Sequence, residues 1–437
     1  MPIEKLALLG GHARIARGSV PTDFATLTDE GLEAVEETLR SGRWSMFNSP
    51  EVEAFEEEFA NYVGADYVVM VNSCTTAILA ALRASGVESD DRVAVPAYTY
   101  VGSCLPLIEI GARPVWVDVS AATPNMDAAG LHAAFISGEL AAVVIPLLFG
   151  SSLGIDETIS ACVDSRTSLI FDCAQFLGDR ETTARLVEIG ICCFSFGDSK
   201  LLRIGEGGAV ATNSCAIADR VRRFRHEGES WLDQDVSRLA LESVAPLAVL
   251  ESLGSAQRGL NLRPLAYAAT VGRAQLIEMP NFLEMTHRNA NEFDRAIGSE
   301  VLIKKPHSRK IWWSYPCVVQ KPLERNTLLA ALLAEGIPVG VHFPRLLPQH
   351  PIFGGDLSTS LAGIFPNATN FAEQHLVFPI YPAIEPETAR SIGEVMLDVL
   401  EDPSLHSEAA RSAGQKLLQD ARLSDLSSGL YMFLVDS

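Results

Sequence analysis

Residues 191–212 read ICCFSFGDSKLLRIGEGGAVAT, and this stretch decides the fold class. It holds two short apolar runs, ICCFSF (191–196) and GAVAT (208–212), joined by a segment that contains Lys200 and several glycines. A short continuous apolar run, without polar alternation, is typical of a strand that is buried on both faces. We therefore predict two strands of a covered sheet, with Lys200 in the connection between them.

Five further apolar runs of the same kind precede this stretch. They are YVVMV (67–71), RVAVP (92–96), PVWVDV (114–119), AAVVIPLLF (141–149) and SLIFD (168–172). Helical patterns alternate with them, which indicates an α/β domain with a mainly parallel sheet and helices on both faces. Residues 27–62 predict two amphipathic helices before the first strand, separated by SGRWSMFNSP (41–50), with Thr28 at the start of the first.

A second, smaller α/β region follows a mostly helical stretch over residues 214–300. It consists of a strand at 311–320, a helix at 326–337, the run PVGVHF (338–343) and a closing helix at 386–400. We predict three parts. These are an N-terminal segment with the large domain (1–262), a small C-terminal domain (263–402) and a polar tail (403–437).

Composition excludes several partners and locations. The 437 residues carry 55 acidic and 34 basic side chains, a formal net charge of −21, which disfavours nucleic acid and anionic membranes as partners. No apolar run approaches the roughly 18 residues that span a bilayer. The N-terminus lacks the basic start of a secretory signal, so we expect a cytoplasmic protein. None of the eight cysteines forms a C-x-x-C pair, which argues against a zinc site or a disulfide framework.

Polar residues directly after the predicted strands are the candidates for function, because ligands bind at the carboxyl ends of strands in open α/β sheets. Ser73, Cys74 and Thr75 follow YVVMV and precede a helical stretch. Hydroxyls and free backbone N–H groups at a helix N-terminus suit an anion such as phosphate. An ordinary Ser/Thr helix cap is the alternative interpretation.

Two further strand ends carry candidate residues. Tyr100 follows RVAVP, where an aromatic ring is either a stacking platform for a planar ligand or part of the core. Asp172 ends SLIFD, and a carboxylate at the end of a buried strand is costly without a positive partner. A pyridinium nitrogen is such a partner, and capping of the next helix is the alternative.

Lys200 is the only lysine between Lys5 and Lys304, so it is not one of many solvated surface lysines. Apolar segments and a glycine-rich turn surround it, and burying an ammonium group there is expensive. Schiff-base formation removes the charge and uses a lysine whose pKa is lowered. An exposed loop lysine is the alternative, and the scarcity of lysine in this region weakens it.

Taken in order, these motifs resemble those of the DegT/DnrJ/EryC1/StrS family of pyridoxal 5′-phosphate (PLP)-dependent sugar and cyclitol aminotransferases, within the fold-type I aspartate aminotransferase superfamily. The resemblance extends from about residue 25 to about residue 400. The motifs that carry it are NSCTTAI (72–78), VPAYTYVGS (95–103), GARPVWVDV (111–119), FDCAQ (171–175), FSFGDSKLLRIGEGGAVAT (194–212), GLNLRP (259–264), HFP (342–344) and FPIYP (378–382).

The resemblance implies roles around PLP, with a large PLP-binding domain and a small C-terminal domain. Lys200 would form the Schiff base and later shuttle protons, and Asp172 would pair with the pyridinium nitrogen. Tyr100 would stack on the ring and Gln175 would lie near the cofactor hydroxyl. The phosphate contacts would be Ser73, Cys74, Thr75 and Ser195, together with Asn261 from the other subunit of a homodimer. The substrate contacts would be His342 and Arg263.

The implied reaction moves an amino group from glutamine or glutamate to a keto-sugar or keto-cyclitol, in secondary-metabolite (antibiotic) biosynthesis. Related sugar dehydratases have histidine in place of the lysine, whereas Lys200 is kept here. An enzyme that forms an aromatic amine by dehydration, like amino-hydroxybenzoate synthase, remains an alternative, because residues 147–150 read LLFG where many members have His-Leu-Tyr-Gly. Cys74 also stands where many members have glycine. An idle binding protein is the third alternative, and the presence of Lys200, Asp172 and Ser195 argues against it.

Overall fold

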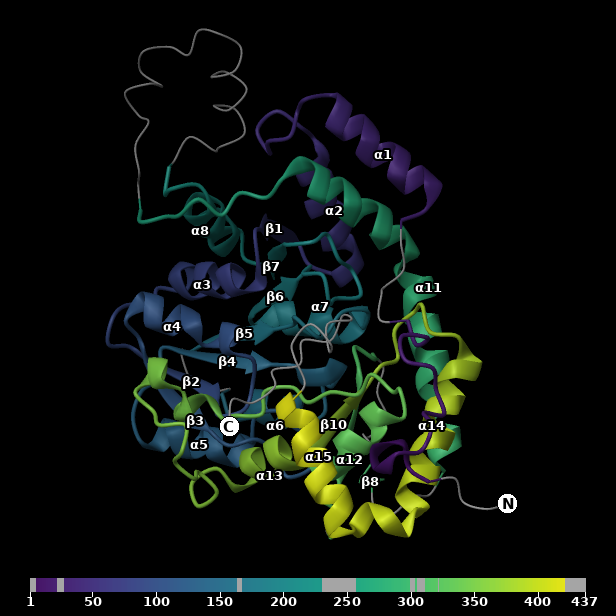
Figure 1. Cartoon of the computed structure of the whole chain (residues 1–437). Coiled ribbons are helices and arrows are strands. Elements are labelled where there is room, and N and C mark those ends of the chain that lie inside the picture. Colours follow the sequence, from purple (N-terminus) through teal and green to yellow (C-terminus); the bar gives the residue numbers. More distant parts are fainter. Residues whose placement is uncertain are drawn as a thin grey trace, which may run out of the picture.

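The computed structural model describes residues 5–21, 27–162, 167–229, 257–298, 303–304, 311–320 and 322–420. A seven-stranded sheet lies between layers of helices, and a three-stranded sheet with its own helices lies beside it (Figure 1). The predicted α/β class with a mainly parallel sheet is confirmed. Most of the residues between His226 and Gly259 lie outside the described residues.

The strands of the large sheet match the predicted apolar runs closely. They are β1 (Tyr67–Val71), β2 (Arg92–Pro96), β3 (Arg113–Val117), β4 (Ala142–Pro146), β5 (Ser168–Asp172), β6 (Ile191–Ser195) and β7 (Gly208–Thr212). Their order is β1-β7-β6-β5-β4-β2-β3, and only β7 runs antiparallel to its neighbours. The start of β7 therefore lies at the same edge as the carboxyl ends of the other strands, where ligands bind in such sheets.

The helices that the structure describes fall into an earlier and a later group. The earlier group is α1 (Asp29–Arg40), α2 (Glu51–Val63), α3 (Cys74–Ala84), α4 (Leu105–Ile110), α5 (Ala128–Ile136), α6 (Ile155–Ser160), α7 (Arg180–Ile189) and α8 (Cys215–Arg225). The later group is α11 (Ala266–Ile297), α12 (Arg325–Ala334), α13 (Pro366–Gln374), α14 (Pro386–Glu401) and α15 (Glu408–Asp420). Short 3-10 turns are η1 (Ala7–Leu9), η2 (Val101–Ser103), η3 (Leu148–Gly150), η4 (Leu347–Gln349), η5 (Pro351–Phe353) and η6 (Pro403–His406).

Both faces of the large sheet are buried, which explains its continuous apolar strands. On β1, Val68 and Met70 join one core with Phe59 of α2, whereas Val69 and Val71 join the core on the opposite face with residues of α3. Each such side chain contributes about 1.5–3 kcal/mol when fully buried. Thr28 starts α1 as predicted, because its hydroxyl accepts a hydrogen bond from the Gly31 N–H at 3.2 Å.

The small sheet is antiparallel, in the order β10-β9-β8, with β8 (Ile303–Lys304), β9 (Tyr315–Val319) and β10 (His375–Phe378). The run PVGVHF (338–343) does not form a strand and makes a single bridge, from Gly340 to Val377. Proline at its start lacks an N–H group, and Phe343 near its end has a φ of 51°, so the chain turns away from the ladder. The four-residue strand β10 was not predicted because it is too short to show a periodicity.

The two sheets are tied together by the long helix α11, which contacts α1 and α2 at one end and α14 at the other (Figure 1). In its C-terminal third, the buried Asn289 amide donates hydrogen bonds to the Tyr381 and Ile384 carbonyls, at 2.9 and 2.8 Å. These bonds fix the loop after β10 against the helix. The loop carries part of the site described below.

Both ends of the described chain pack on the part of the molecule that contains the three-stranded sheet, here called the smaller unit. The Ala7 and Arg14 N–H groups donate to the carboxylate of the fully buried Glu335, at 2.9 and 3.1 Å, and Leu6 joins the small-sheet core. The described part of the tail, residues 403–420, folds into η6 and α15, and α15 contacts α12. The predicted three-part division remains a prediction, and this packing places the first residues with the small unit.

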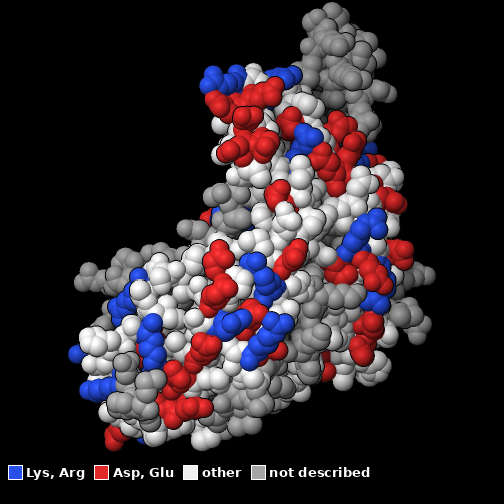
Figure 2. All heavy atoms as spheres, turned by 90° about the vertical axis from the view of Figure 1, so that its right-hand side faces the viewer, with Lys and Arg blue, Asp and Glu red and all other residues white. Residues whose placement is uncertain are grey.

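Charged side chains of both signs lie on the face of the molecule that Figure 2 shows. On the face that carries α11 and α14, basic and acidic side chains are interspersed, and acidic ones gather toward the end where α1 lies (Figure 2). Among the helices that the structure describes, none combines the length and the apolar character that crossing a membrane requires.

Gly208 provides a test of how closely β7 packs against the start of α3. A Cβ atom at this position would lie 2.4 Å from the Ser73 carbonyl carbon and 2.6 Å from the Cys74 nitrogen, both rigid backbone atoms. Gly208→Ala should therefore lower the free energy of unfolding by about 1–3 kcal/mol, as measured by urea denaturation. The matched control is Gly363→Ala, because no heavy atom lies within 4 Å of the Cβ added there. Equal stability of the two variants would contradict the packing described.

Candidate active site

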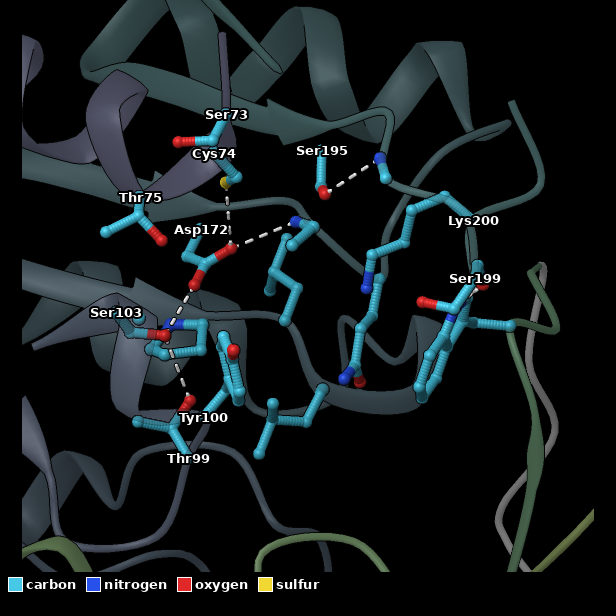
Figure 3. A pocket seen from close by; sticks show the side chains of 18 of the residues that line it. Ser73, Cys74, Thr75, Thr99, Tyr100, Ser103, Asp172, Ser195, Ser199 and Lys200 are labelled. Atoms are coloured by element: carbon cyan, nitrogen blue, oxygen red, sulfur yellow. Dashed lines mark hydrogen bonds between the residues drawn. The ribbon is translucent and has the colours of Figure 1, made fainter. Parts of the chain in front are cut away.

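A cavity of about 230 Å³ lies at the carboxyl edge of the large sheet, where loops of the smaller unit approach it. Its lining includes nine of the eleven residues that the sequence singled out, and Figure 3 shows many of them pointing into the same space. These nine are Ser73, Cys74, Thr75, Tyr100, Asp172, Gln175, Ser195, Lys200 and His342. The strand ends thus converge as the parallel topology requires.

Asp172 forms the base of this cavity and is only 7% exposed. One carboxylate oxygen accepts a hydrogen bond from the Ser103 hydroxyl at 2.6 Å, and the other accepts from the Ala174 N–H at 3.0 Å (Figure 3). The Cys74 thiol donates to the second oxygen at 3.7 Å. Ser103 in turn contacts the Thr99 hydroxyl at 3.2 Å. A buried carboxylate is therefore held in one orientation by several donors.

Ser103 was not singled out from the sequence, although it ends the quoted motif VPAYTYVGS. It lies on η2, and its position is set by the backbone that follows β2 rather than by any pattern in the letters. A serine at the end of a small-residue run carries no signal of its own. Only the approach of β5 to this loop shows that its hydroxyl is directed at Asp172.

Lys200 is the last residue of the turn after β6, and its backbone N–H donates to the Gly197 carbonyl at 3.0 Å. Its amine lies 4.7 Å from the centre of the Trp313 ring, and the Trp313 indole N–H donates to the neighbouring Ser199 carbonyl at 3.0 Å. Burial is the largest influence on the amine and lowers the pKa of Lys200, whereas nearby Cys74 and Asp172 act to raise it. A lysine with a lowered pKa offers more neutral amine for attack on a carbonyl carbon.

The opposite end of the cavity is the N-terminus of α3. The Ser73 hydroxyl caps this helix by accepting from the Thr76 N–H at 3.2 Å, so the cap interpretation is correct for this side chain. Cys74 and Thr75 form the first turn, where the helix dipole favours negative charge. Ser195 approaches from the end of β6, and its hydroxyl accepts from the Gly197 N–H at 3.4 Å (Figure 3). The helix cap formed by Ser73 leaves room for an anion to bind at the same end of the cavity.

Gly102 allows two predicted side chains to meet beside this helix. A Cβ atom there would lie 2.7 Å from the Tyr100 ring and 2.8 Å from the Thr75 hydroxyl oxygen. The absence of a side chain thus lets the aromatic ring lie close to the loop after β2. Tyr100 remains 46% exposed and lines the cavity, so it is not part of the hydrophobic core.

Gln175 and the LLFG turn are held together by one short contact. The Gln175 side-chain oxygen accepts a hydrogen bond from the Phe149 N–H at 2.6 Å, and Phe149 adopts a φ of 55°. Leu147 and Leu148, which precede it, line the cavity with apolar side chains. The position at which many family members carry histidine is therefore an apolar part of the wall here.

His342 lies in the wall contributed by the smaller unit. Burial and the nearby Lys200 lower the pKa of His342 to about 4, so this imidazole is uncharged near neutral pH. The backbone N–H of His342 donates to the His375 Nε2 at 3.0 Å, and the backbone carbonyl of His342 accepts from the Tyr98 hydroxyl at 2.9 Å. His375, which is 33 residues away in sequence, therefore fixes the backbone of His342 from behind and does not line the cavity itself.

Two of the predicted residues are not brought to the cavity of their own chain. Arg263 lies outside it and is bound to the Glu227 carboxylate at 2.5 Å and to the His226 Nδ1 at 2.6 Å. Arg263 therefore does not line the cavity of its own chain, and its expected substrate contact remains a prediction. Asn261 pairs with His226 through a backbone bridge, also outside the cavity. Its expected role from a second subunit remains a prediction.

A known protein family matches most of this chain. The model of the DegT/DnrJ/EryC1/StrS aminotransferase family matches residues 25–397. The chain belongs to this family. It is thus an enzyme of an aminotransferase family, as the motifs of the sequence indicate.

Individual relatives and a solved structure are similar to this chain over different shares of its length. A dTDP-3-amino-3,4,6-trideoxy-alpha-D-glucose transaminase from Streptomyces venezuelae is 28% identical over 85% of this chain and 93% of its own. An L-glutamine:2-deoxy-scyllo-inosose aminotransferase from Streptoalloteichus tenebrarius is 34% identical over 46% of this chain and 49% of its own. The crystal structure of 3-amino-5-hydroxybenzoic acid (AHBA) synthase superposes with a TM-score of 0.75, covering 87% of this chain and 99% of that one at 23% identity. The last comparison shows the shared fold.

The titration of Lys200 tests the electrostatics of this site. Burial lowers its pKa and the Asp172 carboxylate opposes that effect, so Asp172→Asn should lower the pKa of Lys200 further. We expect the pH at which Lys200 is half-labelled by an amine-specific reagent in cofactor-free protein, read by mass spectrometry, to lie below that of a free lysine. The same pH should fall again in the variant. Labelling of Lys200 at the pH of a free lysine, or a rise in the variant, would contradict the site described.

Proposed function

We propose that this chain is a PLP-dependent aminotransferase that moves an amino group from glutamine or glutamate to the ketone carbon of a sugar or cyclitol, in secondary-metabolite (antibiotic) biosynthesis. One observation carries the proposal. The amine of Lys200 and the carboxylate of Asp172 follow adjacent parallel strands and line one cavity, each held by its own set of contacts. This pair suits a ligand that has both a carbonyl group and a basic ring nitrogen.

The residues present fit PLP group by group. Its aldehyde suits the Lys200 amine, and its ring nitrogen suits the buried Asp172 carboxylate. Its phosphate suits the start of α3 with Thr75 and Ser195, because a helix N-terminus favours anions. Tyr100 supplies an aromatic face for the ring. When bound, PLP supplies an electron sink that lets an amino group leave one carbon and join another.

Asp172 has the task of holding a proton on the ring nitrogen. Its two oxygens accept from the Ser103 hydroxyl and from the Ala174 N–H, which fixes the orientation of the carboxylate. Hydrogen bonds to a charged group contribute about 1.5–3 kcal/mol each. The Cys74 thiol, whose pKa burial raises well above its usual value, stays protonated and serves as a third, weaker donor.

Lys200 has two tasks, covalent attachment and proton transfer. Its lowered pKa provides neutral amine for attachment. With the cofactor present, the same nitrogen would also be able to take a proton from one substrate carbon and return it to another, a contribution of about 10²–10⁴-fold to the rate. Trp313, from the smaller unit, holds this segment by donating its indole N–H to the Ser199 carbonyl. The neutral His342 beside it adds no competing positive charge.

A homodimer that shares its active sites is part of the proposal. Asn261 lies outside the cavity of its own chain, and large apolar side chains are exposed near it. They are Trp44, Leu260 and Leu265, which are 52%, 47% and 47% exposed. Apolar side chains gathered at one surface favour association with another molecule. A second copy is the occupant that the family resemblance implies, and it would bring its Asn261 toward the phosphate end.

The alternative is an enzyme of the same family that forms an aromatic amine by dehydration. The apolar wall at Leu147 and Leu148 favours it, because many aminotransferases of the family carry a histidine there. The two activities differ in their product. Mass spectrometry of the product distinguishes an amino-sugar or amino-cyclitol from an aromatic amine that has lost water.

Absorbance tests the first half of the proposed reaction. Holoprotein should show a visible band, and addition of glutamine or glutamate should bleach it because the cofactor then carries the amino group. A keto-sugar or keto-cyclitol that accepts the amino group should restore the band. A coloured protein that every amino donor leaves unchanged would contradict transamination and favour the dehydrating alternative.

Substitutions at the two central residues test their roles. Lys200→Ala should abolish turnover while PLP still binds non-covalently, and Asp172→Asn should reduce turnover by about 10²-fold or more with little change in melting temperature. Ser103→Ala should give a smaller loss that Ser103→Thr restores, because the threonine keeps the hydroxyl. Steady-state kinetics measures these losses. Normal turnover in the lysine variant would refute the assignment.

A further inference from the structure

Trp313 lies next to Lys200 although it comes from a distant part of the chain. Trp313 lies just before β9, whereas Lys200 follows β6. The Lys200 side chain extends into the cavity from the backbone beside Ser199 (Figure 3). Its amine lies 4.7 Å from the centre of the Trp313 ring, within the range of a cation–π contact. An aromatic ring from the smaller unit is therefore placed against the reactive nitrogen.

Three contacts fix the orientation of this indole ring. Its N–H donates to the Ser199 carbonyl at 3.0 Å. Its ring lies 5.2 Å from the His342 ring and 6.3 Å from the Phe149 ring. Phe149 belongs to the turn after β4, and His342 belongs to the smaller unit. The indole is thus held from both sides of the cavity beside Lys200.

The groups that face Lys200 determine how readily its amine holds a proton. Burial is the largest influence and lowers the pKa of Lys200, while Asp172 and an ionised Cys74 would raise it. Burial also raises the pKa of the Cys74 thiol well above its usual range, so this thiol stays uncharged. His342, with a pKa of about 4, is neutral as well. Asp172 is therefore the charged group of this set that favours the ammonium form.

A bound cofactor changes this balance, because Asp172 pairs with the ring nitrogen in the proposed function. Asp198 and Glu206 also line the cavity, but both are exposed, and water screens their charges. Tyr381, whose pKa burial raises, carries no charge. The electron-rich face of the Trp313 ring then remains beside Lys200 as a partner for positive charge.

We infer that Trp313 is a positioning residue for Lys200, and that its ring face stabilises the protonated amine and so keeps the lysine basic enough to accept a proton at neutral pH. A general base is most effective when its proton affinity matches the working pH. The indole N–H bond to the Ser199 carbonyl holds the turn that carries the lysine at the distance this interaction needs. This inference rests on the proposed function in its use of Lys200 as the base.

Fluorine on the indole ring tests the interaction with little change in the shape of the site. Protein grown with fluorinated tryptophan carries it at all five tryptophans, so the face of the Trp313 ring becomes less negative while its N–H is kept. In cofactor-free protein, the pH at which Lys200 is half-labelled by an amine-specific reagent should fall stepwise as the number of fluorine atoms increases. The same series in Trp313→Phe is the matched control and should show no such trend.

Replacement of the ring should act in the same direction. Trp313→Leu should lower the half-labelling pH of Lys200 by about 0.5–1.5 units, the range for a cation–π contact away from water, and Trp313→Phe by less. A ring that only excluded water would have the opposite effect, because its removal would admit water and raise this pH. Trp312→Phe is the second control and should leave the pH unchanged. Trp312 stacks on Tyr315 in the core of the smaller unit, at 5.0 Å, and does not line the cavity.

The pH profile of turnover separates this inference from the proposed function. On holoprotein, the acid limb of the profile should move to lower pH in Trp313→Leu, since a less basic lysine loses its proton at lower pH. A lower half-labelling pH without that movement would reject the proposed role of Lys200 in the reaction alone. A half-labelling pH that fluorination leaves unchanged, or that rises in Trp313→Leu, would overturn the inference.

Discussion

Burial of the Asp172 carboxylate is the constraint on which the rest of the site depends. A negative charge that is 7% exposed is stable only where donors surround it, and Ser103, the Ala174 N–H and the Cys74 thiol provide them. The same low polarity lowers the pKa of Lys200, while Asp172 limits that shift. One environment therefore produces both a fixed anion and a reactive amine, the two groups that PLP chemistry requires. Neither group would have these properties at the surface of the protein.

The large sheet brings these two groups together, and the smaller unit contributes the remaining wall of the cavity. Strands β5 and β6 are parallel neighbours, so Asp172 and the turn that holds Lys200 leave the sheet at the same edge. The reversed strand β7 places Gly208 against the start of α3, which positions the anion end of the cavity. Trp313, Ser314 and His342 then approach from the small-sheet side. The large sheet and the smaller unit therefore both contribute to the wall of the cavity.

Much of this arrangement is predictable from the sequence, for identifiable physical reasons. Strands buried on both faces are continuous apolar runs, so all seven strands of the large sheet were placed within a few residues, and the polar residues after them converge because parallel strands end at one edge. Ser103 and Trp313 were not singled out, because their roles depend on contacts between segments far apart in the chain. The run 338–343 was placed in the smaller α/β region without a more definite structure, and it forms only a bridge because the chain turns at Phe343. Arg263 could not be placed from its motif alone, because its partner Glu227 lies 36 residues away.

The central claim is that the Lys200 nitrogen holds PLP covalently. The most direct measurement is borohydride reduction of the holoprotein, followed by proteolysis and mass spectrometry of the labelled peptide. The account predicts a single reduced pyridoxyl adduct on Lys200, the only lysine between residues 5 and 304, with no adduct when an excess of amino donor is added before reduction. An adduct on another lysine, or none on holoprotein that shows the visible band, would contradict it.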